Sequence, residues 1–354
     1  MRIAILSFSS EGQLLGRRLR EALEGRGSDC TLRRCPEGGL REWTQNHFLS
    51  NDALIFVGSC GLAVRAIAPF VQSKSSDPAV LVIDETGKFV ISLLSGHLGG
   101  ANELTKWVAE QLSATPVITT ATDRRGLFAV DSWARRNGYF VSNPEKIKEV
   151  SSALLEGKTV TFCSDFPISG KVPEQLRLLQ RDRSEAEREV GEQKPGEIDF
   201  SVSWQRRESE ELRIVVPSLY IGIGARKGIS SEAVEQLVDR CLKELKASPL
   251  AVKAVASIDL KANEEGIFEC CARHAWTFLS FSQEELARVE GDFSASAFVK
   301  EVTGVDNVCE RSAVLAAGQG SRLLLRKQSL DGVTCAIALE AISLSFDTAQ
   351  PPQS

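Results

Sequence analysis

The first 135 residues alternate short aliphatic runs with longer stretches whose apolar residues recur at helical spacing, and this order restricts the fold more than any other feature. Five runs have the length and composition of strands, at residues 2–8, 52–59, 79–84, 88–94 and 116–120. Three stretches carry apolar residues on one helical face, at residues 11–25, 61–71 and 101–112. This order predicts an α/β fold with an open, mostly parallel sheet flanked by helices.

The same alternation resumes after residue 212 and predicts a second α/β domain. Strand candidates lie at residues 252–259, 276–282, 321–328 and 333–342, and helix candidates at residues 262–275 and 307–318. Between the two halves, residues 174–200 are densely charged and contain a Pro-Gly break, which predicts a weakly packed middle segment. We therefore expect an N-terminal α/β domain at 1–135, a variable middle segment at 136–212 and a C-terminal α/β domain at 213–345.

Composition excludes several classes of protein. Of the 354 residues, 43% are hydrophobic and 25% are charged, and no apolar run reaches the roughly 18 residues of a membrane-spanning helix. The beginning of the chain reads as a strand and not as a signal peptide, so we expect a cytoplasmic protein that binds no membrane. The net charge of −5 argues against a nucleic-acid partner. Nine cysteines without a C-x-x-C pair, and only three histidines, argue against a metal site.

The segment SGHLGGANE, residues 95–103, lies where a predicted strand leads into a predicted helix. Ligands of open α/β sheets bind at such exits, where glycines let the backbone approach and helix N–H groups attract anions. His97 and Glu103 add two groups that can move protons. The candidate substrate-binding residues here are Ser95, Gly96, Gly99, Gly100 and Asn102. The alternative is a tight turn whose glycines solve a packing problem and whose histidine is structural.

The segment TTATDRRG, residues 119–126, follows the next predicted strand and combines hydroxyl, carboxylate and guanidinium groups. Asp123 could orient a histidine or accept a proton, and Arg124 could bind a carboxylate through two hydrogen bonds. Thr120 and Thr122 are further candidate substrate contacts in this segment. Alternatively, Thr122 or Asp123 caps the next helix while the arginines are solvated.

Further candidate contacts lie outside these two segments. GIGARKG, residues 222–228, does not complete the dinucleotide pattern G-x-G-x-x-G, because Lys227 stands where the third glycine is required. The segment either contacts an anion or is a solvated loop. Its candidate binding residues are Gly222, Gly224, Arg226 and Lys227. Arg65 follows a glycine-flanked strand exit at residues 58–61.

Several of these segments resemble a known family. SGHLGGANELT at 95–105 and VITTATDRRGLFAVDSWA at 117–134, with GIGARKG, SIDLKANEEG and TGVDNVCERSAVLAA further along the chain, closely resemble the CbiG family, the cobalt-precorrin-5A hydrolases of anaerobic cobalamin (vitamin B12) biosynthesis. The resemblance runs from about residue 2 to residue 340. It implies an N-terminal domain, a variable middle segment and a C-terminal domain.

The resemblance also implies a reaction. The δ-lactone on a cobalt-bearing, ring-contracted macrocycle is opened, and a two-carbon fragment leaves as acetaldehyde to give cobalt-precorrin-5B. Cobalt then arrives inside the tetrapyrrole substrate, and we expect no cofactor held by the chain itself. Other enzymes of the cobalamin pathway are candidate partners.

Candidate roles follow from this reaction. His97 is the first candidate for the catalytic base, and Glu103 or Asp123 for its orienting group or a second proton acceptor. The N–H groups of Gly99 and Gly100 are candidate oxyanion donors. The peripheral acetates and propionates of the macrocycle require cations, for which the candidates are Arg65, Lys74, Arg124, Arg226 and Lys227.

Two other functions are alternatives. A corrinoid-binding or handover protein without catalysis would use the same glycines and arginines only to hold carboxylates. A serine hydrolase using Ser95 is disfavoured, because the chain has no G-x-S-x-G elbow. Acetaldehyde release separates the hydrolase from a binding protein.

Overall fold

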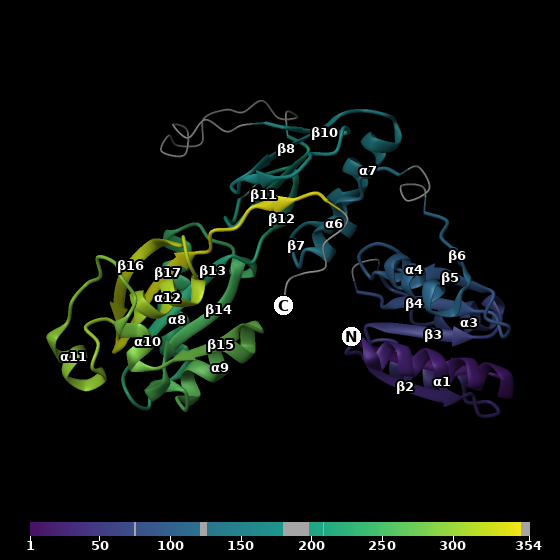
Figure 1. Ribbon diagram of the computed structural model, residues 1–354, viewed down its shortest axis with the longest axis horizontal. Helices are drawn as coiled ribbons and strands as arrows, with labels where there is room; N and C mark the ends of the chain where they lie inside the picture. The colour runs from purple at the N-terminus through teal and green to yellow at the C-terminus, as the bar shows by residue number, and fades with distance from the viewer. Residues whose placement is uncertain (74–75, 121–125, 180–197, 208, 348–354) are drawn as a thin grey trace. The chain divides into compact units, whose positions relative to one another are not determined.

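The computed structural model describes residues 1–73, 76–120, 126–179, 198–207 and 209–347 (Figure 1). The chain divides into two compact units. The first contains Met1–Arg136 and Ile147–Lys158, and the second contains Asn137–Lys146 and the chain from Thr159 onward. The division into three segments expected from the sequence, with its bounds, stays a prediction. Across the described ranges, no helix is long and apolar enough to cross a membrane.

The first unit is built on a six-stranded sheet in the order β2-β1-β3-β4-β5-β6. Its strands are β1 (Arg2–Ser7), β2 (Asp29–Arg34), β3 (Ala53–Val57), β4 (Ala79–Ile83), β5 (Phe89–Leu94) and β6 (Thr115–Val117). All neighbours are parallel except β4 and β5, which form the antiparallel pair expected of a hairpin. The predicted mostly parallel sheet is confirmed. The strand expected at 116–120 ends earlier, at Val117.

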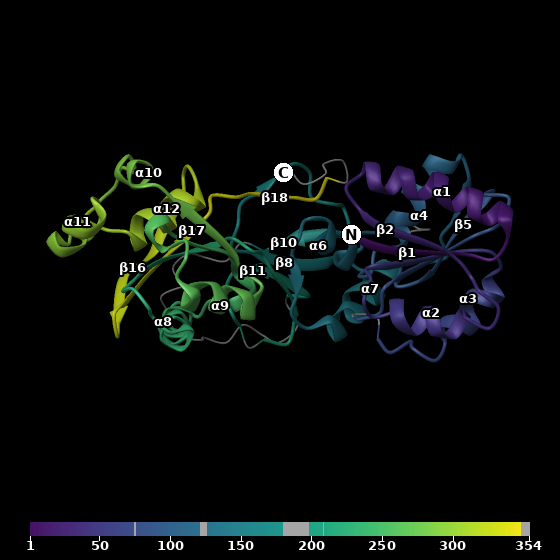
Figure 2. The same cartoon turned by 90° about the horizontal axis from the view of Figure 1, so that it is seen from below.

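Helices cover both faces of this sheet (Figure 2). The four are α1 (Ser10–Gly25), α2 (Leu40–His47), α3 (Cys60–Ile67) and α4 (Ala101–Leu112). Side chains alternate along a strand, so Ile3 and Ile5 of β1 pack with α1 and α4, whereas Ala4 and Leu6 pack with α2 and α3. Two short helices, α6 (Val130–Arg136) and α7 (Ile147–Leu155), complete the unit.

A five-stranded sheet in the second unit takes four of its strands, β7 (Phe140–Val141), β8 (Val160–Ser164), β10 (Leu176–Leu178) and β11 (Phe200–Ser203), from the segment that was expected to be variable. Its order is β10-β8-β11-β12-β7, with β12 (Leu212–Val215) as the fifth strand. Phe162 stacks on Phe200 at 5.0 Å, and both are completely buried. The expectation of weak packing is therefore wrong for the described part of this segment. Residues 180–197 lie outside the described residues.

The last described strand returns to this part of the second unit. β18 (Leu344–Ser345) pairs in parallel with β9 (Ile168–Ser169), and the two form a separate two-stranded sheet. Phe346 places its ring edge-on to Phe162, 5.3 Å away. Leu344 is completely buried, and Phe346 is 6% exposed. Residues 344–346 are therefore part of the packing of the middle segment.

The C-terminal α/β sheet has the order β15-β14-β13-β17-β16. Its strands are β13 (Leu219–Ala225), β14 (Val252–Ile258), β15 (Thr277–Phe281), β16 (Arg322–Leu330) and β17 (Val333–Leu339). β14 pairs in parallel with both β13 and β15, whereas β17 runs antiparallel to both of its neighbours, β13 and β16. Its helices are α8 (Ser231–Glu244), α9 (Glu265–His274), α10 (Gln283–Ala287), α11 (Ala297–Thr303) and α12 (Cys309–Ala317). The predicted α/β class is confirmed in both halves of the chain (Figure 1).

Candidate functional site

The glycine-rich segment forms a tight turn between β5 and α4. Ser95 and Gly100 both adopt left-handed backbone conformations, with φ of 56° and 81°. The Gly100 N–H donates to the His97 carbonyl at 2.9 Å, and the Ala101 N–H donates to the Ser95 carbonyl at 3.1 Å. Because these N–H groups at the helix start are already used inside the turn, the Gly100 N–H is not open to an anion in this structure. An oxyanion-donor role stays a prediction for Gly99.

Close packing explains two of the glycines. A Cβ at Gly96 would lie 2.8 Å from the side-chain oxygen of Asn102. A Cβ at Gly99 would collide with the Cβ of Ser95 and lie 2.9 Å from the Ser95 carbonyl oxygen. The turn therefore needs glycine at both positions whatever it binds, which supports the structural alternative for these two residues.

His97 is held by the start of α6. Its Nδ1 lies 2.7 Å from Ser132 Oγ and 4.0 Å from the nearer carboxylate oxygen of Asp131. That same oxygen accepts the Ser132 N–H at 2.9 Å. The side chains of His97 and Asp131 are 22% and 10% exposed. The Ser132 hydroxyl thus holds the imidazole at Nδ1, with the buried carboxylate of Asp131 close by.

Neither Asp131 nor Ser132 was a candidate from the sequence. They lie more than 30 residues after His97, and only the packing of α6 beside the turn brings them together. The one local signal is Asp131, a carboxylate among the buried residues Val130, Trp133 and Ala134 of a short helix. A buried acidic side chain in an apolar helix face needs a partner, which points to a site.

Asn102 joins the turn to the neighbouring segment. It is 3% exposed, accepts a hydrogen bond from Ser92 Oγ at 2.7 Å and donates one to Thr120 Oγ1 at 3.0 Å. The structure therefore brings together SGHLGGANE and the beginning of TTATDRRG, as the sequence predicted for two neighbouring strand exits. Four further candidates, Lys74, Thr122, Asp123 and Arg124, lie outside the described residues.

Glu103 binds arginines. Its Oε2 accepts a hydrogen bond from Arg135 Nη1 at 3.0 Å, and its Oε1 lies 3.4 Å from Arg136 Nε. Arg135 also lies against the turn, because a Cβ at Gly100 would collide with its guanidinium group. Among the described residues, the carboxylate beside His97 is Asp131, whereas Glu103 pairs with arginines; the role suggested for Asp123 stays a prediction. Arg135 is a further residue that the sequence analysis missed.

Ser95 does not have the surroundings of a catalytic serine. Its Oγ is buried, and within the part of the chain that the structure describes it has no hydrogen-bond partner. A serine nucleophile requires an adjacent base to accept its proton. The described geometry therefore gives no support to the serine hydrolase alternative.

The glycines of GIGARKG serve packing in the C-terminal sheet. A Cβ at Gly222 would collide with the Cys309 carbonyl and lie 2.8 Å from the Ala313 nitrogen, so glycine lets α12 lie directly on β13. A Cβ at Gly224 would lie 2.5 Å from Thr334 Oγ1. These contacts explain both glycines without a ligand, and their predicted binding role stays untested.

Arg226 and Lys227 are exposed at the end of β13, where the sequence placed an anion contact. The turn that carries them is fixed on both sides. The Arg226 N–H donates to the Gly332 carbonyl at 3.0 Å, and the Gly228 N–H donates to Glu264 Oε2 at 2.9 Å. The exposed cations therefore sit on an ordered turn.

Glu264 connects two motifs that are far apart in sequence, GIGARKG and SIDLKANEEG. Its other oxygen accepts a hydrogen bond from Lys261 Nζ at 3.0 Å, and both side chains are largely buried. The hydrogen bond from Lys261, together with that from the Gly228 N–H, lowers the pKa of Glu264. The carboxylate thus stays ionised and holds the turn.

Arg65 and the motif at 303–317 are two further segments that the sequence analysis singled out. Arg65 is exposed on α3, which packs on the opposite sheet face from α4. Within the other motif, Glu310 is completely buried and accepts hydrogen bonds from the Ser294 N–H, the Ser294 hydroxyl, Asn307 and the Lys327 N–H at 2.7–3.0 Å. A buried carboxylate with so many donors is a structural anchor.

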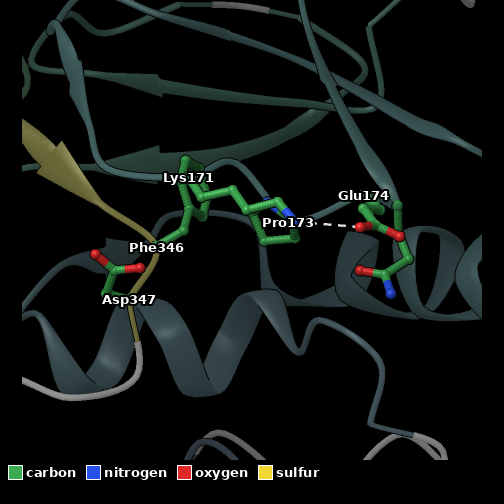
Figure 3. A pocket seen from close by; sticks show the side chains of 6 residues that line it. Lys171, Pro173, Glu174, Phe346 and Asp347 are labelled. Atoms are coloured by element: carbon green, nitrogen blue, oxygen red, sulfur yellow. Dashed lines mark hydrogen bonds and ion pairs between the residues drawn. The ribbon is translucent and has the colours of Figure 1, made fainter.

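A groove and the metal-ligating side chains were the other places to look for a site among the described residues. Figure 3 shows a groove of about 330 Å³ in the second unit, lined by Lys171, Pro173, Glu174, Gln175, Phe346 and Asp347. Lys171 and Glu174 pair across it at 3.2 Å, and it contains none of the candidate residues. Among the described residues, no three histidine, cysteine or carboxylate side chains are grouped to hold a metal ion.

The fold and the site define an α/β protein whose glycine turn holds a histidine against a hydroxyl and a carboxylate. Three family models match it: cobalamin synthesis G N-terminal at residues 42–123, the cobalamin biosynthesis central region at 128–217 and cobalamin synthesis G C-terminus at 219–338. The chain belongs to the cobalamin synthesis G (CbiG) family, as the sequence motifs indicated.

Relatives extend over most of the chain. It is 33% identical over 314 residues to the cobalt-precorrin-5A hydrolase of Priestia megaterium, covering 85% of this chain and 82% of the relative. It is 35% identical to the cobalt-precorrin-5A hydrolase of Salmonella typhimurium, covering 86% of each. A crystal structure of a putative cobalamin biosynthesis protein G homolog from Sulfolobus solfataricus matches with 23% identity and a TM-score of 0.41, over 95% of this chain and 96% of that one.

Proposed function

We propose that this chain is a cobalt-precorrin-5A hydrolase of cobalamin biosynthesis, acting on a cobalt-containing tetrapyrrole. Two relatives with that name share 33% and 35% of their residues with it over more than four fifths of their length. The observation that carries the proposal is His97, held at its Nδ1 by Ser132 beside Asp131 in the family's glycine turn. These relatives are named as hydrolases, so the non-catalytic handover alternative is not favoured.

The reaction requires two proton transfers. Water adds to the lactone carbonyl and the ring C–O bond breaks, which gives a carboxylic acid and a secondary alcohol. The alcohol then loses its proton, its oxygen forms a carbonyl, and the adjacent C–C bond breaks. The electron pair of that bond enters the conjugated macrocycle, and acetaldehyde leaves. Both transfers need a positioned base near the substrate.

His97 is the proposed base. When Nδ1–H is donated to Ser132, the lone pair of the imidazole is on Nε2. Nε2 then accepts the proton of the attacking water, donates it to the ring oxygen as the C–O bond breaks, and, neutral again, accepts the proton of the alcohol in the second step. Asp131 lies near enough to stabilise the imidazolium that forms. His97 is thus the proposed catalytic residue, with Ser132 and Asp131 as positioning residues.

The remaining expectations enter as part of this proposal. Cobalt belongs to the substrate, and the chain needs no cofactor of its own for the two proton transfers. Arg226 and Lys227 are proposed contacts for peripheral carboxylates, supported by their exposure on a fixed turn. A cytoplasmic location and contacts with other pathway enzymes stay predictions.

The test is acetaldehyde release from cobalt-precorrin-5A by the full-length protein. We expect stoichiometric acetaldehyde, trapped as a hydrazone, together with conversion of the pigment to cobalt-precorrin-5B. A protein that retains the pigment and releases no acetaldehyde would instead be a corrinoid-binding or handover protein. A variant with His97 replaced by alanine serves as the control for non-enzymatic breakdown of the lactone.

A further inference from the structure

Arg135 lies directly over the glycine turn. A Cβ built on Gly100 would collide with Cζ and both terminal nitrogens of its guanidinium group, so this group occupies the space beside the Gly100 Cα. The side chain is 30% exposed, which leaves part of the group accessible to a ligand. A planar cation is therefore held at the turn that carries His97.

The helix position of Arg135 aligns it with the groups around His97. Asp131 and Arg135 are four residues apart on α6, so they lie on the same helix face, one turn from each other. Asp131 is beside His97, and Arg135 is beside Gly100. One face of α6 thus supplies both the positioning carboxylate and a guanidinium group to the turn.

Arg135 lies among other charged side chains. Arg135 and Arg136 both pair with Glu103, at 3.0 and 3.4 Å, and none of the three side chains is more than 38% exposed. Two guanidinium groups share the Glu103 carboxylate, and Asp131, the carboxylate one turn away on α6, lies beside His97. A guanidinium group binds a carboxylate through two parallel hydrogen bonds.

We infer that Arg135 binds a peripheral carboxylate of the substrate at the glycine turn, and that Glu103 positions Arg135. This inference rests on the proposed function, because it takes the tetrapyrrole with its acetates and propionates as the ligand. It gives Glu103 a different role from the proton transfer expected from the sequence: its carboxylate is bound to guanidinium groups and fixes the one that lies on Gly100. Gly100 is needed because any side chain there would displace Arg135.

The kinetic test compares Arg135→Gln with Arg136→Gln. Both variants remove one positive charge from the same cluster, but only Arg135 contacts Gly100. A carboxylate is bound equally before and during the reaction, so its loss raises KM and leaves kcat unchanged. We expect Arg135→Gln to raise the KM for cobalt-precorrin-5A about 10- to 100-fold, the value of a charged hydrogen bond. Arg136→Gln should raise KM by less than about threefold.

A double-mutant cycle tests the role of Glu103. Glu103→Gln should raise KM in the wild-type background and have no further effect in the Arg135→Gln background, because it acts through Arg135. A purely structural role would give the same effect in both backgrounds. Arg135→Lys keeps the charge without the planar fork, and its KM should fall between those of wild type and Arg135→Gln. Unfolding midpoints of all variants establish that each one is folded.

Equilibrium binding of the product, cobalt-precorrin-5B, followed by absorbance, separates this inference from the proposed function. Wild-type protein that releases no acetaldehyde would contradict the proposed function. Wild-type protein that is active, with a folded Arg135→Gln variant whose KM and product affinity are unchanged, would overturn only the role of Arg135. Equal KM increases for Arg135→Gln and Arg136→Gln would also overturn it, because they would indicate a diffuse charge effect.

Discussion

Gly100 is subject to two independent constraints. Its φ of 81° is in the left-handed region, where the backbone of any residue with a Cβ is strained. A Cβ would also displace the guanidinium group of Arg135. Gly96 and Gly99 are constrained by packing within the turn itself. The turn is therefore rich in glycine chiefly for steric reasons. Because Gly100 has no side chain, the guanidinium group of Arg135 can lie against the turn that also carries His97.

We predict that Gly100→Ala lowers stability by about 1–2 kcal/mol through the left-handed backbone and raises KM in the same direction as Arg135→Gln. The matched control is Gly25→Ala at the end of α1, where φ is not positive and no atom lies within 4 Å of the added methyl group. This control should be neutral or stabilising by up to about 1 kcal/mol. Thermal unfolding and steady-state kinetics measure both effects, and a Gly100→Ala variant with wild-type KM would argue against the Arg135 contact.

Ser132 is expected to affect kcat, because its hydroxyl contacts Nδ1 of His97. Removing its hydroxyl in Ser132→Ala frees Nδ1 of His97 from a 2.7 Å contact and leaves the ring less well oriented. We predict that kcat falls about three- to tenfold, the value of one hydrogen bond, while KM changes little. Initial rates of acetaldehyde release measure this. An unchanged kcat would show that Ser132 does not orient the base.

Some residues of the candidate site could be predicted from the sequence, and others could not. The sequence indicated both the glycine turn and the segment at 119–126 as strand exits, where ligands of open α/β sheets bind. The hydrogen bond from Asn102 to Thr120 that joins them comes from the structure. Asp131, Ser132 and Arg135 come from a short helix whose docking is set by tertiary contacts. Local sequence patterns contain no information on which neighbour such a helix packs against, so these partners were missed.

At the level of elements, Glu264 fixes the segment after β13 to the segment before α9. It accepts hydrogen bonds from the Gly228 N–H and from Lys261, and these bonds lower its pKa. A carboxyl whose pKa is lower in the folded than in the unfolded state stabilises the fold above the unfolded pKa. That contribution is lost as the pH falls through the lower, folded value.

We predict that Glu264→Gln lowers stability at neutral pH, and that the difference from wild type shrinks as the pH falls through and below the usual range of glutamate. Urea unfolding at a series of pH values measures the difference. Glu265→Gln, the neighbouring carboxylate at the first residue of α9, is the control. A Glu264→Gln deficit that stays constant down to strongly acidic pH would show that the ionised carboxylate does not hold this turn.

For the whole molecule, β18 and Phe346, near the end of the described chain, pack on the middle segment. Phe162, Phe200 and Phe346 pack together although they are separated by 38 and 146 residues. Sequence analysis predicted both α/β halves, because their strands and helices have clear local periodicity. It failed for the middle segment, because charge density between residues 174 and 200 obscured a core assembled from distant short strands.

We predict that Phe346→Ala destabilises the second unit by about 3 kcal/mol or more, since a buried aromatic ring is removed. Phe346 is 6% exposed, whereas Phe140, on the edge strand β7 of the neighbouring sheet, is 46% exposed. Phe140→Ala is therefore the matched control and should cost much less. Chemical unfolding measures both, and equal losses for the two variants would contradict the packing of the chain end on this core.

The central claim is that His97 transfers protons at the glycine turn, and it is tested most directly by single-turnover acetaldehyde release from saturating cobalt-precorrin-5A. We predict that His97→Ala releases acetaldehyde about 10²–10⁴-fold more slowly than wild type, the usual contribution of a positioned base, while its unfolding midpoint and its affinity for cobalt-precorrin-5B stay near the wild-type values. A folded His97→Ala protein that turns over at a rate near that of wild type would contradict the account.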